Sequence, residues 1–274
     1  MISVIIPSFK NPKYLDLCLK SIIENQEAKN EIIVVLDGYA DLSRDVVDKY
    51  KNDISVLEFE DNRGMSHAIN FGVYNAIGDW ILVVSEDNVF CREWDVKLSD
   101  NTEMGNPNVM HHKDDVNIVY TINQIEPVGP SIYNFVIKDY GKTLEEFKYE
   151  EFLKDDELTI KDLTSDGSTF PFFMRKIDFM KVGGFDIDYP SPFVVDWDFF
   201  LKCELAGLEM LRIRQFNFYH FVSKSTKNRN GYIESTNERN EFFSSETKAA
   251  EYFEYKWGFQ PRRDKNNRCK QFIP

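Results

Sequence analysis

The sequence predicts an α/β fold in which helices cover both faces of a doubly wound, mostly parallel central sheet. Short runs rich in valine and isoleucine recur through the first hundred residues, and stretches with helical spacing separate them. Each run is apolar almost throughout, which is typical of strands in a parallel sheet, because both faces of such a sheet are buried. The chain of 274 residues is long enough to form one such unit with a sizeable core.

The expected strands and helices alternate along the first part of the chain. Asn11 and Pro12 supply a cap and a first-turn proline for a helix that follows the first strand. A second helix precedes the fourth strand, and its apolar residues from Met65 to Ala76 share one face. We expect strands at residues 3–7, 31–37, 54–59 and 80–85.

The pattern is less regular beyond residue 100. We treat residues 101–167 as a variable insertion, because short apolar pieces alternate there with glycine, proline and acidic runs. Residues 223–274 form a polar tail with an expected helix around 246–257 and a basic end. Between these two segments we expect strands at 169–174, 210–213 and 216–221 and a helix at 196–206.

Charge and cysteine content exclude several kinds of partner. The formal net charge of −13 repels a nucleic-acid backbone, and no basic patch in the first 200 residues offsets it. The four cysteines lie far apart, so we expect reduced thiols in a cytoplasmic protein rather than a zinc knuckle or a redox pair. No apolar run approaches the ~20 residues of a membrane span, and residues 1–7 do not form a signal sequence, so we expect any membrane contact to be peripheral.

Polar residues stand where the expected strands end. Ligands of an open parallel sheet bind beyond the carboxyl ends of its strands, and carboxylates that meet there attract a cation such as Mg²⁺ or Mn²⁺. Alternatively, these acids only end strands and cap helices. The chain has no G-x-G-x-x-G or P-loop motif, so a bound diphosphate would be held by a metal and side chains. The polar residues are Ser8, Asp37, Asn62, Arg63, Ser85, Glu86 and Asp87.

Four stretches of the first half resemble the inverting family 2 glycosyltransferases, which have the GT-A fold. Residues 4–9 (VIIPSF) are similar to the opening strand and turn of that family, and residues 33–38 (IVVLDG) to the segment whose acid holds the nucleoside. Residues 62–72 and 76–87 resemble its N-x-G-x-x-x-A-x-N-x-G helix and the strand into its metal-binding D-x-D motif. Ser85 replaces the first acid of that motif, and Leu36 stands where the family often has another Asp.

The second half contains three further matches to this family. The residues GGFD at 183–186 and VDWDF at 195–199 resemble its acceptor-side segment, and YHFVS at 219–223 resembles the stretch with a C-terminal metal-binding histidine. The resemblance makes Asp196 the catalytic base and Asp87 and His220 the metal ligands. It assigns donor binding to Pro7, Ser8, Asp37, Arg63, Ser85 and Glu86.

Each of three assigned residues also has a structural interpretation. Asp196 could be a helix N-cap, His220 a structural histidine and Arg63 a solvated surface residue.

The resemblance implies a metal-dependent enzyme that uses Mn²⁺ or Mg²⁺. It would move a sugar from a UDP-, GDP- or dTDP-sugar to a hydroxyl of a glycan or another acceptor, with inversion. Residues 1–222 would then be the catalytic domain, with a nucleotide-sugar-binding half at 1–100 and an acceptor half at 168–222. The basic and aromatic residues of the tail would suit an anionic acceptor or a membrane surface.

Two alternatives remain open. One is a catalytically inactive GT-A-like binding module, which Ser85 and Leu36 favour. The other is a sugar nucleotidyltransferase, although the glycine-rich, arginine-bearing loop of those enzymes is absent. The absence of a Q-x-x-R-W motif argues against a processive polysaccharide synthase.

Overall fold

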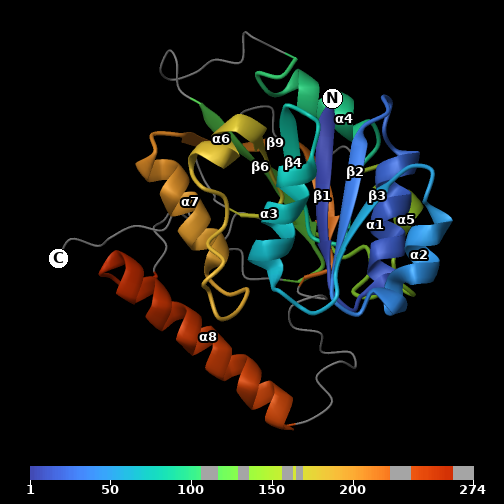
Figure 1. Cartoon of the computed structure of the whole chain (residues 1–274). Helices are drawn as coiled ribbons and strands as arrows, with labels where there is room; N and C mark the ends of the chain where they lie inside the picture. Colours follow the sequence, from blue (N-terminus) through green and yellow to red (C-terminus); the bar gives the residue numbers. More distant parts are fainter. Residues whose placement is uncertain (106–116, 129–135, 156–162, 165–168, 223–235, 262–274) are drawn as a thin grey trace.

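The computed structural model describes six stretches of the chain (Figure 1). In the last stretch, side chains are described from residue 246 onward. The tail residues from Arg262 to the C-terminus, which include the predicted basic end, lie outside the described residues. The described stretches are 1–105, 117–128, 136–155, 163–164, 169–222 and 236–261.

The centre of the molecule is a mixed sheet, which has nine strands within the described residues. Its order is β3-β2-β1-β4-β8-β6-β9-β5, and β7 pairs with β6. The contiguous strands β3, β2, β1 and β4 are parallel, whereas β8 runs antiparallel to both β4 and β6. The predicted α/β class with a mostly parallel central sheet is therefore confirmed. The strands are β1 (Ile2–Ser8), β2 (Glu31–Asp37), β3 (Ser55–Phe59), β4 (Trp80–Val83), β5 (Asn88–Val89), β6 (Ile118–Glu126), β7 (Val136–Ile137), β8 (Phe172–Arg175) and β9 (Glu209–His220).

Helices cover both faces of the sheet. Successive side chains of a strand point to opposite faces, so Val35 of β2 belongs to the core cluster that includes residues of α3 and α7, whereas Val34 belongs to the cluster that includes residues of α1 and α4. This two-sided burial explains why the first strands are apolar almost throughout. The helices are α1 (Pro12–Glu24), the 3₁₀ helix η1 (Ala40–Ser43), α2 (Arg44–Lys49), α3 (Met65–Asn75), α4 (Trp94–Asp100), α5 (Tyr149–Phe152), α6 (Lys176–Lys181), α7 (Val195–Leu205) and α8 (Thr236–Trp257).

The sheet differs from the sequence prediction beyond residue 100. The two strands expected at 210–213 and 216–221 are the single strand β9. The segment 101–167, treated above as a variable insertion, contains β6, which is buried along its whole length and pairs with both β8 and β9. Strand β6 is hard to predict because buried polar residues interrupt its apolar pattern. Their hydrogen-bond partners lie on a strand that is distant in sequence: the side-chain amide of Asn123 donates to Asn217 Oδ1 at 2.6 Å.

Helix α8 packs against the part of the core that includes α7. It begins ten residues before the predicted helix, and it contributes Ala249 and Phe253 to the core beside α7 (Figure 1). Among the described residues, none of the helices combines the length and the apolar character that a membrane span needs.

Candidate active site

The strand ends that the sequence singles out meet at one edge of the sheet. Strands β1, β2 and β4 are parallel neighbours, so Ser8, Asp37 and the segment 85–87 follow them at the same edge, opposite the N-terminus in Figure 1. Pro7, the second-to-last residue of β1, is partly buried, and Ser8, the last residue, is buried.

Asp37 fixes the loop that leads into α3. Its Oδ1 accepts a hydrogen bond from the Arg63 amide at 2.6 Å, and its Oδ2 accepts one from the Gly64 amide at 2.8 Å. Burial raises the pKa of Asp37, and these two amide hydrogen bonds oppose that rise. Asp37 therefore sets the conformation of the loop from which the exposed Arg63 side chain projects.

A pocket of about 310 Å³ opens beside this loop. Arg63, Ser66 and His67 line it from the start of α3, and the segment 189–192 lines it from the other side. The pocket thus lies between the two halves of the chain, and Arg63 is the predicted donor-binding residue that reaches it.

Glu86 lies beneath the loop that follows β1. The Phe9 amide donates to its Oε1 at 3.4 Å, and the side chain is only 1% exposed. Burial raises the pKa of Glu86 to about 8, Asp87 raises it as well, and nearby Ser8 and Asn11 partly offset the rise. Glu86 is therefore placed to support the loop after β1.

Ser85 begins the tight turn that leads to Asp87. The Ser85 amide donates to Asn88 Oδ1 at 3.0 Å, and the Asn88 amide donates back to the Ser85 carbonyl at 3.1 Å. Because Asn88 closes the turn, the next residues, Glu86 and Asp87, are held in fixed positions.

The two predicted metal ligands, Asp87 and His220, come together. Strand β5 pairs with β9 so that Asn88 lies opposite His220, and the Phe221 amide donates to the Asp87 carbonyl at 3.2 Å. His220 Nε2 lies 3.6 Å from Asp87 Oδ1. Residues 133 positions apart in sequence thus share one site at the strand edge.

Glu126, which sequence reasoning missed, completes this cluster. Its Oε1 lies 2.8 Å from His220 Nδ1, and the residue is 6% exposed at the end of β6. Burial lowers the pKa of His220, but Asp87 and Glu126 outweigh it and raise that pKa overall. An acid at the end of a strand is the signal that could have identified Glu126, had β6 been expected.

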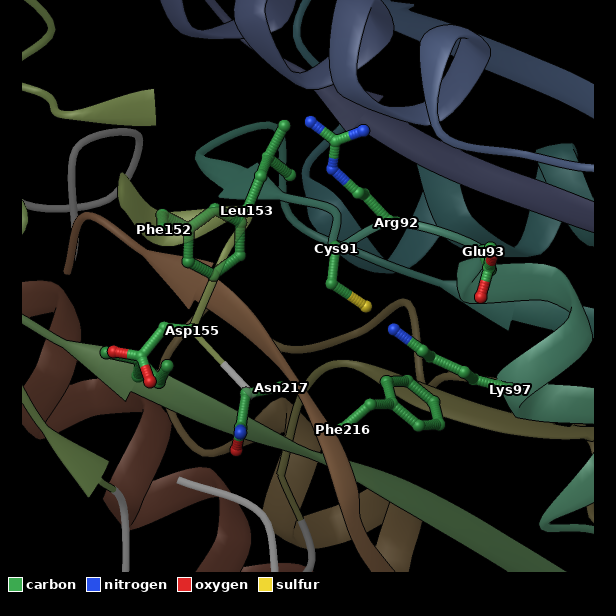
Figure 2. Close-up of a pocket in the computed structure, with 10 residues that line it drawn as sticks. Cys91, Arg92, Glu93, Lys97, Phe152, Leu153, Asp155, Phe216 and Asn217 are labelled. Carbon is green, nitrogen blue, oxygen red and sulfur yellow. The ribbon is translucent and has the colours of Figure 1, made fainter. Parts of the chain in front are cut away.

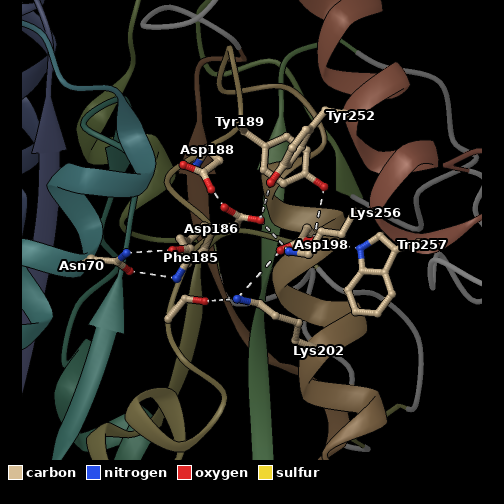
Figure 3. Close-up of polar contacts among 11 residues, drawn as sticks. Asn70, Phe185, Asp186, Asp188, Tyr189, Asp198, Lys202, Tyr252, Lys256 and Trp257 are labelled. Atoms are coloured by element: carbon tan, nitrogen blue, oxygen red, sulfur yellow. Dashed lines mark hydrogen bonds and ion pairs between the residues drawn. The ribbon is translucent and has the colours of Figure 1, made fainter.

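Asp196 and Asp198 occupy different environments on the first turns of α7. Asp196 is partly buried, whereas Asp198 is fully buried and faces α8 (Figure 3). Asp198 Oδ1 accepts from Trp257 Nε1 at 2.8 Å and lies 2.7 Å from Lys256 Nζ. Since residues two apart on a helix point in different directions, Asp196 lies on a different side of α7 from these contacts.

The GGFD turn is tied to both halves of the molecule. Asn70 of α3 exchanges two hydrogen bonds with the backbone of Phe185, at 2.7 and 2.8 Å (Figure 3). Gly184 has φ +60°, and a Cβ there would lie 2.6 Å from Asn70 Oδ1, so a glycine is required. Asp186 lies 2.6 Å from Lys256 Nζ on α8.

A second pocket lies away from these residues (Figure 2). It has a volume of about 210 Å³ and contains side chains of both charges, among them Arg92, Glu93, Lys97 and Asp155. The predicted site residues are not among those that line it.

Comparison with known proteins identifies the family. The model of glycosyl transferase family 2 matches residues 3–178 of the chain. An uncharacterized glycosyltransferase of Haemophilus influenzae is 26% identical over 203 residues, which cover 74% of this chain and 61% of the relative. The chain thus spans about three fifths of the length of that relative.

Two solved structures share the fold. S. aureus TarS 1–349 in complex with UDP-GlcNAc has a TM-score of 0.57 at 17% identity, over 94% of this chain and 73% of that one. The mannosyltransferase PcManGT from Pyrobaculum calidifontis in complex with GDP-Man and Mn²⁺ has a TM-score of 0.57 at 14% identity, over 95% and 65%. These similarities confirm the expected GT-A fold. With the match over residues 3–178, they establish that the chain belongs to glycosyl transferase family 2.

Proposed function

We propose that this protein transfers a sugar from a nucleotide-sugar donor to an acceptor hydroxyl, with inversion and with the help of a divalent cation. The observation that carries the proposal is the convergence of Asp87, His220 and Glu126 at the strand edge. The relatives support the donor class: TarS has been solved with UDP-GlcNAc and PcManGT with GDP-Man and Mn²⁺.

The chemistry of the cluster fits a cation such as Mn²⁺. Two ligands of one ion with bonds of about 2.1 Å can lie no more than about 4.2 Å apart. Asp87 Oδ1 and His220 Nε2 are 3.6 Å apart, so a single ion could bind both. Carboxylate suits Mn²⁺, and imidazole is a common ligand of divalent transition metals. Within the described residues there is no group of three acidic, histidine or cysteine side chains with complete metal-site geometry, so the donor diphosphate and water would supply the other ligands.

A bound cation would offset the charge that develops on the leaving nucleoside diphosphate. Arg63 would contact that diphosphate from the pocket beside α3. Asp37, through the loop that it fixes, would help to hold the nucleoside next to Pro7 and Ser8.

Asp196 is the proposed general base. Inversion requires a group that takes the proton of the acceptor hydroxyl as the oxygen attacks the anomeric carbon. Asp198 is poorly suited to this task, because its buried carboxylate is engaged with Lys256 and Trp257. Asp196, the second residue of the same helix, is only partly buried, so an acceptor hydroxyl could approach its carboxylate.

The test replaces Asp196 with Asn and measures release of nucleoside diphosphate from UDP- and GDP-sugars. Loss of a general base lowers the rate by ~10²–10⁴-fold, while nucleotide affinity stays unchanged. Asp188→Asn, a change at an exposed acid near Asp186, is the matched control. An Asp196→Asn rate near that of the parent would exclude Asp196 as the base.

Measurements of nucleotide binding and of pyrophosphate release, made beside this assay, separate the alternatives. Wild-type protein that binds a nucleotide without turnover would indicate the inactive binding module. Release of pyrophosphate from a nucleoside triphosphate would indicate the nucleotidyltransferase. A cytoplasmic location and contact of the tail with a membrane stay predictions.

A further inference from the structure

We propose that Glu126 is a positioning residue that holds the His220 ring with its proton on Nδ1, so that the Nε2 lone pair faces the cation beside Asp87. This inference rests on the proposed function, because it concerns the same metal site. The role goes to a residue that none of the motifs in the sequence analysis contains.

The contacts of His220 define the arrangement. Glu126 Oε1 lies 2.8 Å from Nδ1 on one side of the ring, and Asp87 Oδ1 lies 3.6 Å from Nε2 on the other. A neutral imidazole has one N–H donor and one lone pair. Because the contact with Glu126 is the shorter one, we place the proton on Nδ1, which donates to the Glu126 carboxylate. The lone pair then remains on Nε2, on the side of Asp87.

This is the arrangement that metal-binding histidines adopt in proteins. A histidine ligand almost always donates its second ring N–H to a carboxylate, a carbonyl or water, which fixes the tautomer and strengthens the ligand. The Glu126 side chain is 8% exposed, so its carboxylate is shielded from water and is a persistent acceptor for that N–H.

The sheet register places Glu126 at this position. Strands β6 and β9 pair with Ile122 opposite Ile213, and the register then shifts so that Ile125 lies opposite Tyr219. One further step puts Glu126 beside His220. Without the shift, Glu126 would lie beside Asn217, so the irregularity in the β6–β9 ladder is what builds the cluster.

The experiment measures Mn²⁺ affinity by electron paramagnetic resonance of free Mn²⁺, with UDP or GDP present, for wild type, Glu126→Gln and Glu126→Ala. We expect Glu126→Ala to weaken Mn²⁺ binding by about 10–100-fold and Glu126→Gln by a smaller factor. Glu93→Gln, a change at an exposed acid, is the control and should bind as wild type does. Thermal unfolding of each variant verifies that it is folded.

A second measurement reads the tautomer directly. Ring ¹H–¹⁵N correlation spectra resolve the protonated nitrogen of each histidine, and the chain has only four histidines, so His220→Asn assigns the signal. In metal-free spectra recorded at alkaline pH, where the imidazole is neutral, wild type should show the Nδ1–H form, and Glu126→Ala should lose this preference.

The outcomes separate the two proposals. If wild type binds Mn²⁺ and Glu126→Ala binds it equally well, the role of Glu126 is wrong and the metal site stands. If folded wild type binds no Mn²⁺ with either nucleotide, the proposed metal site is wrong, and the role of Glu126 falls with it.

Discussion

Two groups of buried and half-buried carboxylates in this protein have different charge balances. Beside α8, Asp186 and Asp198 share Lys256, and Lys202 Nζ lies 3.8 Å from Asp198 (Figure 3). At the strand edge, Asp87 and Glu126 lie on either side of the imidazole of His220. We call the first group the α8 network and the second the strand-edge cluster.

The α8 network is electrostatically complete. Two carboxylates face two ammonium groups, Trp257 and Tyr189 donate to Asp198, and Lys202 also donates to the Gly184 carbonyl. Such a set leaves no charge for a ligand to neutralise, so it holds the GGFD turn, α7 and α8 together. Its acids are structural even though they lie next to the proposed base.

The strand-edge cluster has a different balance in the contacts between Asp87, Glu126 and His220. Its carboxylates outnumber its basic groups, and the pKa of neighbouring Glu86 rises to about 8 because burial and the charge of Asp87 both oppose its ionisation. We therefore expect charge balance, rather than the number of acids, to distinguish the proposed binding site from the structural α8 network.

The largest expected effect concerns Glu86. A carboxyl whose pKa rises from 4.5 in the unfolded chain to about 8 in the folded protein binds a proton on folding, so metal-free wild type should lose stability as pH rises from about 4.5 to about 8. Glu86→Gln removes this contribution and should reduce the change in unfolding free energy over this pH range by roughly 4 kcal/mol. Urea unfolding at both ends of this pH range, with EDTA present, measures it.

Exposed Glu60→Gln is the control for Glu86→Gln. An unchanged pH dependence in Glu86→Gln would show that the folded protein ionises Glu86 at neutral pH, and the strand edge would then carry more charge than we infer.

A smaller effect is expected in the α8 network. Lys256→Met leaves the buried Asp198 and the half-buried Asp186 with Lys202 as their nearby cation and should lower the free energy of unfolding by about 2 kcal/mol, or roughly 4–8 °C in Tm. The loss stays below that of a fully buried pair, because the Lys256 side chain is 26% exposed. Calorimetry compares it with Lys248→Met, an exposed lysine on the same helix.

Nucleotide binding should be unchanged in Lys256→Met, because Lys256 does not line the pocket beside Arg63, and Tyr189, the network residue that does, keeps its hydrogen bond to Asp198. If that variant instead lost nucleotide or Mn²⁺ affinity while remaining folded, the α8 network would belong to the binding site, and the contrast between the two groups would fail.

Much of the fold follows from local sequence pattern. Strands β1 to β4 are predicted because each is a short run of mainly apolar residues. Helices α1, α3 and α7 are predicted from helical spacing, and both patterns are visible within a dozen residues. Strand β6 escaped prediction because buried polar residues such as Asn123 interrupt its apolar pattern. Their hydrogen-bond partners lie on strands that sequence spacing does not bring near.

The site follows the same rule. Asp87 and His220 were predicted from motifs, and the structure brings them within 3.6 Å. Glu126 is 94 residues from His220, and the α8 network joins residues up to 70 apart. Contacts of this kind depend on sheet register and helix docking, which the sequence does not show directly. The base role of Asp196 stays a prediction.

The most direct test of the metal-assisted donor site is thermal unfolding with UDP, GDP, dTDP and CMP, each with and without Mn²⁺, on wild type and Asp87→Asn. A ligand at 100 times its Kd stabilises the native state by about 2.7 kcal/mol. We expect such a rise for one nucleotide only when Mn²⁺ is present, and no rise in Asp87→Asn. An equal rise without metal, or the same Mn²⁺-dependent rise in Asp87→Asn, would contradict the account.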